Sequence, residues 1–254
     1  MDALRVTRVT VHAPITSFRH PFFVVGAQPS FDIPPPSTVH GHCASALGRW
    51  PDPREFFFGI HFTYRSKVRD LEHQHIASAA PGGARPVVTQ YGPTRPTTEI
   101  VVQPVSREML FDATMTLYLE RSIGEGFRAP VFAMTLGRSQ DLAEVREVTS
   151  VTLERPTRAR LEHTLLPRAV RPCVRFGATV LLSRHISEPP ARSTTFAQYI
   201  VLHEPVFLGG DSDSTRAFDR VESVSLDDLW CDPTVADDDG FSRGVWIHRL
   251  LDPS

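Results

Sequence analysis

The sequence predicts an α+β protein built on a ferredoxin-like sheet. Three observations predict it: an alternating strand near the N-terminus, a single helix after it, and several strand-like runs beyond. Of the 254 residues, 41% are hydrophobic and 22% are charged, which is ordinary for a globular chain with a sizeable core. The same topology underlies a common RNA-binding module whose sheet stacks bases.

The first strand is predicted at residues 4–12, where apolar and polar residues alternate and β-branched residues are frequent. A helix is expected from Val39 to Leu47, because Pro34, Pro35 and Pro36 cannot lie in a helix interior. Ser37 and Thr38 follow the prolines and are expected as N-caps.

The later elements are predicted from shorter runs. Residues 66–98 hold little core material and contain Pro81-Gly82-Gly83, so a long excursion from the sheet is expected there. A shortened second helix is expected at about residues 120–128. Strands are expected at residues 56–65, 99–105, 114–119, 130–136, 145–153, 173–183 and 197–208, a loop at 209–220, and a mobile acidic segment at 234–240.

The charge is unevenly distributed. Residues 211–254 hold 11 Asp and Glu against 4 Arg, whereas residues 1–210 hold 18 against 23 Lys and Arg, so the formal charge of −2 hides a basic body. A basic body with an acidic tail is compatible with RNA binding on the body.

Several ligand classes have no support in the sequence. Cys43, Cys173 and Cys231 are scattered and odd in number, which favours reduced structural thiols over disulfides or zinc ligands. No cofactor motif and no metal-ligand spacing stands out, and no apolar run approaches the ~20 residues that span a bilayer. The N-terminus lacks the apolar region of a signal peptide, so we expect a cytoplasmic protein without membrane contact.

The polar residues around the proline-rich junction form one candidate phosphate site. Ser37 and Thr38 open the helix, whose N–H groups and dipole favour anions, although plain capping explains them equally well. Arg19, His20 and Gln28 on the preceding loop are in reach of the same backbone.

Three further groups of residues each allow more than one interpretation. His40 and His42 point about 200° apart on a helix and cannot chelate together, so a surface or RNA-contacting role is expected. Arg65, Lys67 and Arg69 alternate, which suits either a phosphate track or a solvated sheet edge. Phe18, Phe22 and Phe23 are core anchors or stacking platforms, with core packing expected for most of them.

One family resemblance rests on four segments that occur in order over residues 4–153. They are SFRHPFFVVGAQPSFDIPPPSTVHGHCASALG near the N-terminus, DLEHQH at 70–75, REMLFDATMTLYL at 107–119 and LGRSQDLA at 136–143. The run closely resembles the signature of the Cas-five family of CRISPR-associated proteins, within the RAMP superfamily, and is most similar to its type I-B branch. The C-terminal third shows no such resemblance.

The resemblance implies a fold and a role. It implies a palm at residues 1–153, a β-hairpin thumb at about 66–98, and a smaller β-rich region at 154–254. It implies a non-catalytic subunit of a type I Cascade ribonucleoprotein complex in antiviral defence, whose partners are the crRNA, the backbone subunit and the large subunit. Direct contact with target DNA stays open. The expected RNA-binding residues are Arg19, His20, Gln28, Ser37, Thr38, His40, His42, Arg65, Lys67, Arg69, His73, His75, Arg107 and Arg138, which would hold the 5′ handle of the guide.

Two alternatives remain open from the sequence. The first is a metal-independent endoribonuclease that processes CRISPR repeat RNA, for which His61, Tyr64 and Lys67 are the candidate acid and base groups. Because His61 and Tyr64 are three apart in a strand, they are expected on opposite faces. The second is a protein-interaction subunit that touches no RNA.

Overall fold

The computed structural model describes residues 3–23, 26–79, 87–89, 92–94, 98–188, 190–209 and 216–251. The strands run β1 Ala3–Thr16, β2 Ala27–Gln28, β3 Phe57–Thr63, β4 Ser66–Ala79, β5 Val87–Thr89, β6 Gly92–Thr94, β7 Thr98–Leu119, β8 Glu144–Glu154, β9 Ala159–Leu161, β10 Thr164–Pro167, β11 Ala178–Ile186, β12 Thr194–Leu202, β13 Val206–Leu208, β14 Leu229–Ala236, β15 Ser242–Trp246 and β16 His248–Arg249. The helices are α1 Pro36–Leu47 and α2 Arg121–Glu125, with 3₁₀ turns η1 Gly126–Arg128 and η2 Arg168–Cys173.

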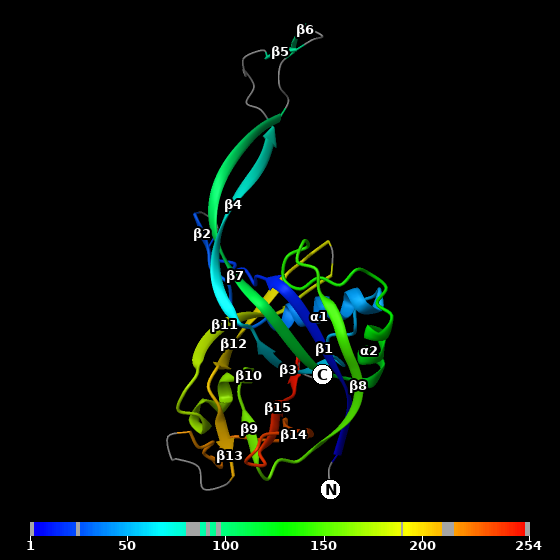
Figure 1. Cartoon of the computed structure of the whole chain (residues 1–254), viewed down its shortest axis with the longest axis vertical. Coiled ribbons are helices and arrows are strands. Elements are labelled where there is room, and N and C mark those ends of the chain that lie inside the picture. The colour runs from blue at the N-terminus through cyan, green and yellow to red at the C-terminus, as the bar shows by residue number, and fades with distance from the viewer. Residues whose placement is uncertain are drawn as a thin grey trace.

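Within the described residues, the strands form one large mixed sheet and two small sheets. The large sheet has the order β13-β9-β15-β14-β8-β1-β7-β3-β16, and β2 and β4 also pair with β7. Strands β10, β12 and β11 form a separate sheet, and β5 pairs with β6. The protein is therefore dominated by strands, with the helices confined to one side of the central strands (Figure 1).

A long antiparallel ribbon of β4 and β7 projects from the body (Figure 1). Its register runs from Ser66 opposite Phe111 to Ala79 opposite Thr98. Of the residues 66–98 expected as a hairpin, β4 forms one strand of the ribbon, but its partner strand is residues 98–111 of β7, almost all beyond that range; residues 80–86, 90–91 and 95–97 lie outside the described residues. The same strand β7 continues into the body, where it pairs with β1 and β3.

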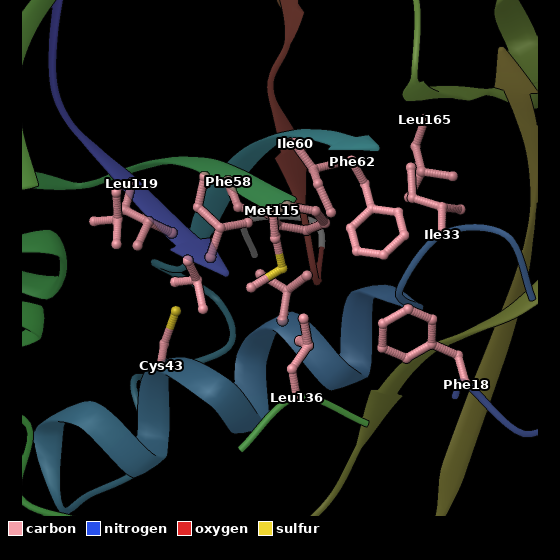
Figure 2. Packing of buried hydrophobic residues seen from close by; sticks show 14 of the residues in the cluster. Phe18, Ile33, Cys43, Phe58, Ile60, Phe62, Met115, Leu119, Leu136 and Leu165 are labelled. Atoms are coloured by element: carbon pink, nitrogen blue, oxygen red, sulfur yellow. The ribbon is translucent and has the colours of Figure 1, made fainter. Parts of the chain in front are cut away.

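The main core lies between α1 and the central strands. Alternate residues of β1, such as Val9 and Val11, face α1 together with Leu117 and Met115, their partners on β7. Figure 2 shows Cys43 of α1 pointing toward Phe58, Met115 and Leu119 of the sheet. Because apolar burial contributes ~25 cal/mol per Å² removed from water, this layer is a large source of the fold's stability.

Strands from the C-terminal region continue the same sheet. Cys231 of β14 pairs with Glu154 of β8, and β15 lies parallel to β9. Val245 of β15 packs with Val6 and Tyr118 on the sheet face opposite α1. The predicted boundary after residue 153 falls at the end of β8, but the described strands on its two sides share one sheet.

The strand predicted at residues 130–136 is wrong. The backbone N–H groups of Val131 and Phe132 donate to the carbonyls of Ala46 and Ser45, at 3.0 and 3.3 Å. The segment therefore satisfies carbonyl groups at the end of α1, which have no partners inside the helix. An apolar run alone does not distinguish this use from a strand.

Two further expectations need correction. Pro35 occupies the N-cap of α1 and Pro36 its first turn, so Ser37 and Thr38 lie inside the helix and are not its caps. The acidic segment 234–240 is not a mobile tail, because it forms the end of β14 and a turn in which Asp237 Oδ1 accepts from the Phe241 N–H at 2.8 Å. The short second helix is confirmed by α2 and η1.

Candidate nucleic-acid interface

A hollow of about 470 Å³ lies where the ribbon meets the body. Its lining comes from the loop after β1, the start of α1, β7, the turn after residue 136, and the β11–β12 hairpin. Five residues that the sequence proposed separately for RNA binding line it: Arg19, Ser37, Thr38, Arg107 and Arg138. We call this space the basal hollow.

The start of α1 contributes fewer free donors than a typical helix. Pro36 has no N–H group, and the Thr38 N–H donates to the Pro35 carbonyl at 2.8 Å. The Ser37 side chain is hydrogen-bonded to Ser183 of β11 at 2.6 Å. The helix dipole still favours an anion here, but hydroxyl groups supply much of the local polarity.

The two arginines behind the hollow belong to an ion network. Glu72 of β4 accepts from Arg107 Nε at 2.7 Å and also from Arg138. Asp141 accepts from two nitrogens of Arg138, at 2.9 and 2.7 Å, and these bonds raise the pKa of that guanidinium. Two carboxylates therefore face two guanidinium groups, and Arg107 is only 7% exposed. The Arg138–Glu72 pair therefore holds the ribbon to the body, whereas the Arg107–Glu72 pair links β7 to β4 within the ribbon, and both arginines also line the hollow.

Gly137 serves the packing of the protein itself. Its φ is 88°, and a Cβ atom there would come within 2.5 Å of Thr16 Oγ1 and 2.6 Å of the Ser17 carbonyl. A glycine is therefore required here by the close approach of the end of β1 and the residue after it.

Exposed aromatic side chains form a rim beside the hollow. Phe22 is 65% exposed, and its ring lies 5.9 Å from that of Phe196, which lines the hollow and is 40% exposed. Phe23 is also exposed and only Phe18 packs in the core, so core packing for most of the three loop phenylalanines is wrong. Exposed rings beside a basic hollow suit base stacking.

Lys67 lies in a different cluster on the other face of the ribbon. Asp32 Oδ1 lies 2.5 Å from Lys67 Nζ and accepts a hydrogen bond from the Tyr64 hydroxyl at 3.0 Å. His203 Nε2 lies 3.6 Å from Asp32 Oδ2. Hydrogen bonding from His203 and then the Lys67 charge lower the pKa of Asp32. Glu108 Oε2 also lies 3.6 Å from Lys67 Nζ. This cluster ties the proline-rich loop to the start of β4.

The remaining basic residues of the ribbon are exposed. Because β4 begins at Ser66, alternation places Lys67, Arg69, His73 and His75 on one face, whereas Arg65 precedes the strand. Arg69 lies 3.7 Å from Glu108, which shares that face.

The histidines at the start of α1 are not on the surface. His40 is bonded to the Pro51 carbonyl at 2.9 Å and His42 Nδ1 to the Thr135 carbonyl at 3.0 Å, and both side chains are buried. Burial lowers the pKa of both rings, that of His42 to about 4. The expectation of a surface position for this pair is corrected.

Two loop residues that were expected to bind RNA are also buried or half-buried. Gln28 is buried on β2, which pairs with β7. The His20 ring lies 3.6 Å from that of Phe31, and burial followed by the Lys67 charge lowers its pKa.

The three candidate residues for RNA cleavage do not form one site. His61 packs against His163, with ring centres 5.6 Å apart, and burial lowers its pKa to about 3. Tyr64 and Lys67 instead meet at Asp32, and burial raises the pKa of Tyr64 to about 12. At neutral pH His61 is a very weak base and Tyr64 a very weak acid.

Sequence reasoning missed the contribution of the β11–β12 hairpin. Ser183, Ile186, Thr194 and Phe196 line the basal hollow, and Arg192 lines an adjoining one. These residues are more than 140 positions from Ser37, and no local motif connects them with it. Only the packing of the hairpin against α1 brings them together.

Within the described part of the chain, no three His, Cys, Asp or Glu side chains gather as a metal site. None of the described helices has both the length and the apolar character that crossing a membrane requires. The three cysteines are all free and buried.

One comparison with known proteins shows a family. The model of the family described as CRISPR-associated protein (Cas_Cas5) matches residues 8–199. No curated protein matches the chain. One similar solved structure, from a "CRISPR RNA-guided surveillance complex", is 18% identical, with 86% of this chain and 95% of that chain covered and a TM-score of 0.45.

A second solved structure, a CRISPR protein from Archaeoglobus fulgidus, is 11% identical over 97% of this chain and 99% of that one, with a TM-score of 0.43. Because both TM-scores are below 0.5, these likenesses add nothing to the match of the family model, which spans most of the sequence. The chain belongs to the Cas-five family of CRISPR-associated proteins.

Proposed function

We propose that this protein is a non-catalytic subunit of a type I CRISPR surveillance complex and holds the 5′ handle of the guide RNA in the basal hollow. The observation that carries the proposal is the convergence of Arg19, Ser37, Thr38, Arg107 and Arg138 on one space. These residues come from four separate segments of the chain.

The chemistry of the hollow fits an RNA backbone with unpaired bases. Arg19 is exposed and has no ion pair among the described residues, so its guanidinium is available for a phosphate. Phe22 and Phe196 offer ring faces at the rim, and single-stranded RNA is commonly held by such stacking beside basic groups.

The ribbon supports an architectural role beside other subunits. A two-stranded ribbon is at best marginally stable in water by itself. Leu71, Ile76, Ile100 and Val102 nevertheless point their apolar side chains into solvent on it. We propose that the ribbon is covered in the assembled complex, where the subunit bridges the backbone and large subunits of a type I-B-like Cascade.

The absence of catalysis is part of the proposal. Its support is the separation of His61 from the pair Tyr64 and Lys67, together with pKa values that move away from neutrality. Metal-free cleavage of RNA needs a base near the 2′-hydroxyl and an acid near the leaving oxygen, at hydrogen-bond reach of one phosphodiester.

The test uses the purified full chain with labelled RNA of its own CRISPR repeat, in excess chelator, with binding and cleavage read on one gel. We expect binding without cleavage. Cutting at one position that is lost in His61→Ala or Lys67→Ala would make the protein a repeat-processing ribonuclease. Failure to bind repeat RNA better than an unrelated RNA would favour the protein-interaction alternative.

A matched pair of variants locates the site. Arg19→Ala should weaken binding several-fold and lower the slope of log affinity against log salt by ~0.7, the value for one phosphate contact to a single strand. Arg220→Ala is the control, since Arg220 is also exposed but does not line the basal hollow. Equal effects of the two variants would refute the placement.

A further inference from the structure

A second hollow, of about 270 Å³, adjoins the first beside α1. The two share Ser37, Thr38, Gly137 and Ile186 in their linings. The second is further lined by Gly41, His42, Ser45, Trp50, Thr135 and Arg192. Its volume lies just below the range of ~300–1,000 Å³ typical of small-ligand pockets, so it suits one compact ring system and not a run of nucleotides.

The lining combines a flat aromatic ring with polar edges. Trp50 is half-buried, and the His40 ring packs 5.3 Å from it, which fixes its orientation. Ile186 adds an apolar surface, while Ser45 and Thr135 add hydroxyl groups. A nucleobase has this same combination of flat apolar faces and hydrogen-bonding edges.

One polar group of the lining lacks a partner. His42 Nδ1 faces the Thr135 carbonyl, which can only accept, so Nδ1 carries the proton and Nε2 is left as an acceptor. Nε2 has no hydrogen-bond donor among the described residues, although the ring is 5% exposed. A buried acceptor without a donor is unfavourable, but Nε2 itself is closed off from the hollow, so it is not a contact for the base.

Gly41 leaves the space open. A Cβ atom added there would meet only the Trp50 ring, at 3.9 Å, so the position is uncrowded and any longer side chain would enter the hollow. Arg192 lies in the β11–β12 turn with a φ of 46°, and its exposed side chain has no ion pair among the described residues. Such a guanidinium is suited to a phosphate.

We propose that this second hollow receives one extruded nucleobase of the bound RNA, stacked on Trp50 in the space left by Gly41, with Arg192 holding an adjacent phosphate. The inference rests on the proposed function and adds a base-reading position to it. Base–aromatic stacking of ~1–3 kcal/mol corresponds to ~5- to 150-fold in affinity.

The experiment is an abasic scan of the repeat RNA against the wild type and Gly41→Leu. For the wild type, we expect one abasic position to weaken binding at least fivefold. Gly41→Leu should bind intact RNA more weakly by the same factor. Removing the base at that one position should then no longer weaken its binding, while the other abasic positions should behave as in the wild type. If Gly41→Leu fails to fold, Gly41→Ala makes the same comparison with a smaller factor, because alanine favours the helix and should not lower the Tm.

A second pair of variants tests the phosphate contact. Arg192→Asn keeps a residue that tolerates a positive φ, and it should lower the salt slope by ~0.7, whereas Arg220→Asn should not. If the wild type binds repeat RNA, but its abasic scan and that of Gly41→Leu differ at no position, the base pocket alone is overturned. Failure of the wild type to bind repeat RNA would instead overturn the proposed function, and the base pocket with it.

Discussion

The ion network behind the basal hollow gives opposite predictions for stability and for RNA affinity. Glu72 is 21% exposed and holds both Arg107 and Arg138. In Glu72→Gln one neutral oxygen replaces the carboxylate, so about one charge-assisted bond is lost. Such bonds contribute ~1.5–3 kcal/mol, and partial exposure reduces this to ~1–2 kcal/mol of unfolding free energy. For a chain of this length the Tm should fall by ~2–8 °C.

The same substitution should tighten RNA binding. Removing one negative charge leaves the two guanidinium groups with a net excess of one positive charge beside the hollow. The slope of log affinity against log salt should become steeper by ~0.7, which is about fivefold tighter binding at 0.1 M salt and no difference near 1 M. Fluorescence anisotropy with repeat RNA across a salt series, beside thermal melting, measures both effects.

The control is Glu125→Gln, which removes the equivalent charge from the exposed pair of Glu125 with Arg128, 2.7 Å apart, away from the hollow. It should leave both stability and RNA affinity essentially unaltered, because exposed ion pairs contribute little. A loss of stability in Glu72→Gln without a steeper salt slope would show that Arg107 and Arg138 serve the fold alone. That outcome would refute their assignment to RNA binding.

Three further predictions concern the residues that position the interface. Asp32→Asn should destabilise the protein by ~1–2 kcal/mol. Because the pKa of Asp32 is lowered by folding, this difference should be full above the unfolded pKa of ~4 and shrink progressively as the pH falls below it, in urea titrations at each pH. Burial lowers the pKa of His42 and His248 to about 4, so these rings keep their full contribution above pH 6.5 and lose it as pH falls toward 4. Stability measured from pH 7 to 4.5 should therefore decline, and a flat profile would contradict their neutral burial. Gly137→Ala should cost at least ~2 kcal/mol and weaken RNA binding, while Gly26→Ala, with a similar φ but open space around it, should cost ~1 kcal/mol.

Local sequence patterns predicted the helices and strands that are determined by residues close together in the chain. The helix over 39–47 follows from three prolines and an apolar face, and β1 follows from strict alternation. The N-terminal motif also identified the family and placed Arg19, Ser37 and Thr38 on one continuous segment, the loop before α1 and the start of that helix. Arg107 and Arg138 were named from their motifs, and both line the hollow.

The failures share one physical origin. Val131 and Phe132 have strand-like composition, but their N–H groups are used to complete the end of α1, a partner 85 residues earlier in the chain. His40 and His42 carry polar side chains, yet the turn around Thr135 and the segment at Pro51 supply carbonyl partners that allow their burial. Periodicity reports which face is apolar, and it cannot report which distant backbone groups need a donor or an acceptor.

The sequence by itself determined the family, the central helix and strands, and the loop that carries the first basic and hydroxyl residues of the interface. The tertiary structure alone decided that Arg192 and Phe196 line these hollows and that Glu72 and Asp141 neutralise Arg107 and Arg138. It also decided that Lys67 lies in a separate cluster with Asp32. Local motifs depend on backbone preferences within a few residues, whereas these contacts depend on how the β11–β12 hairpin and the β4–β7 ribbon pack against α1 and the loop before it. Such packing is set by the shape and charge of surfaces that meet only in the folded chain.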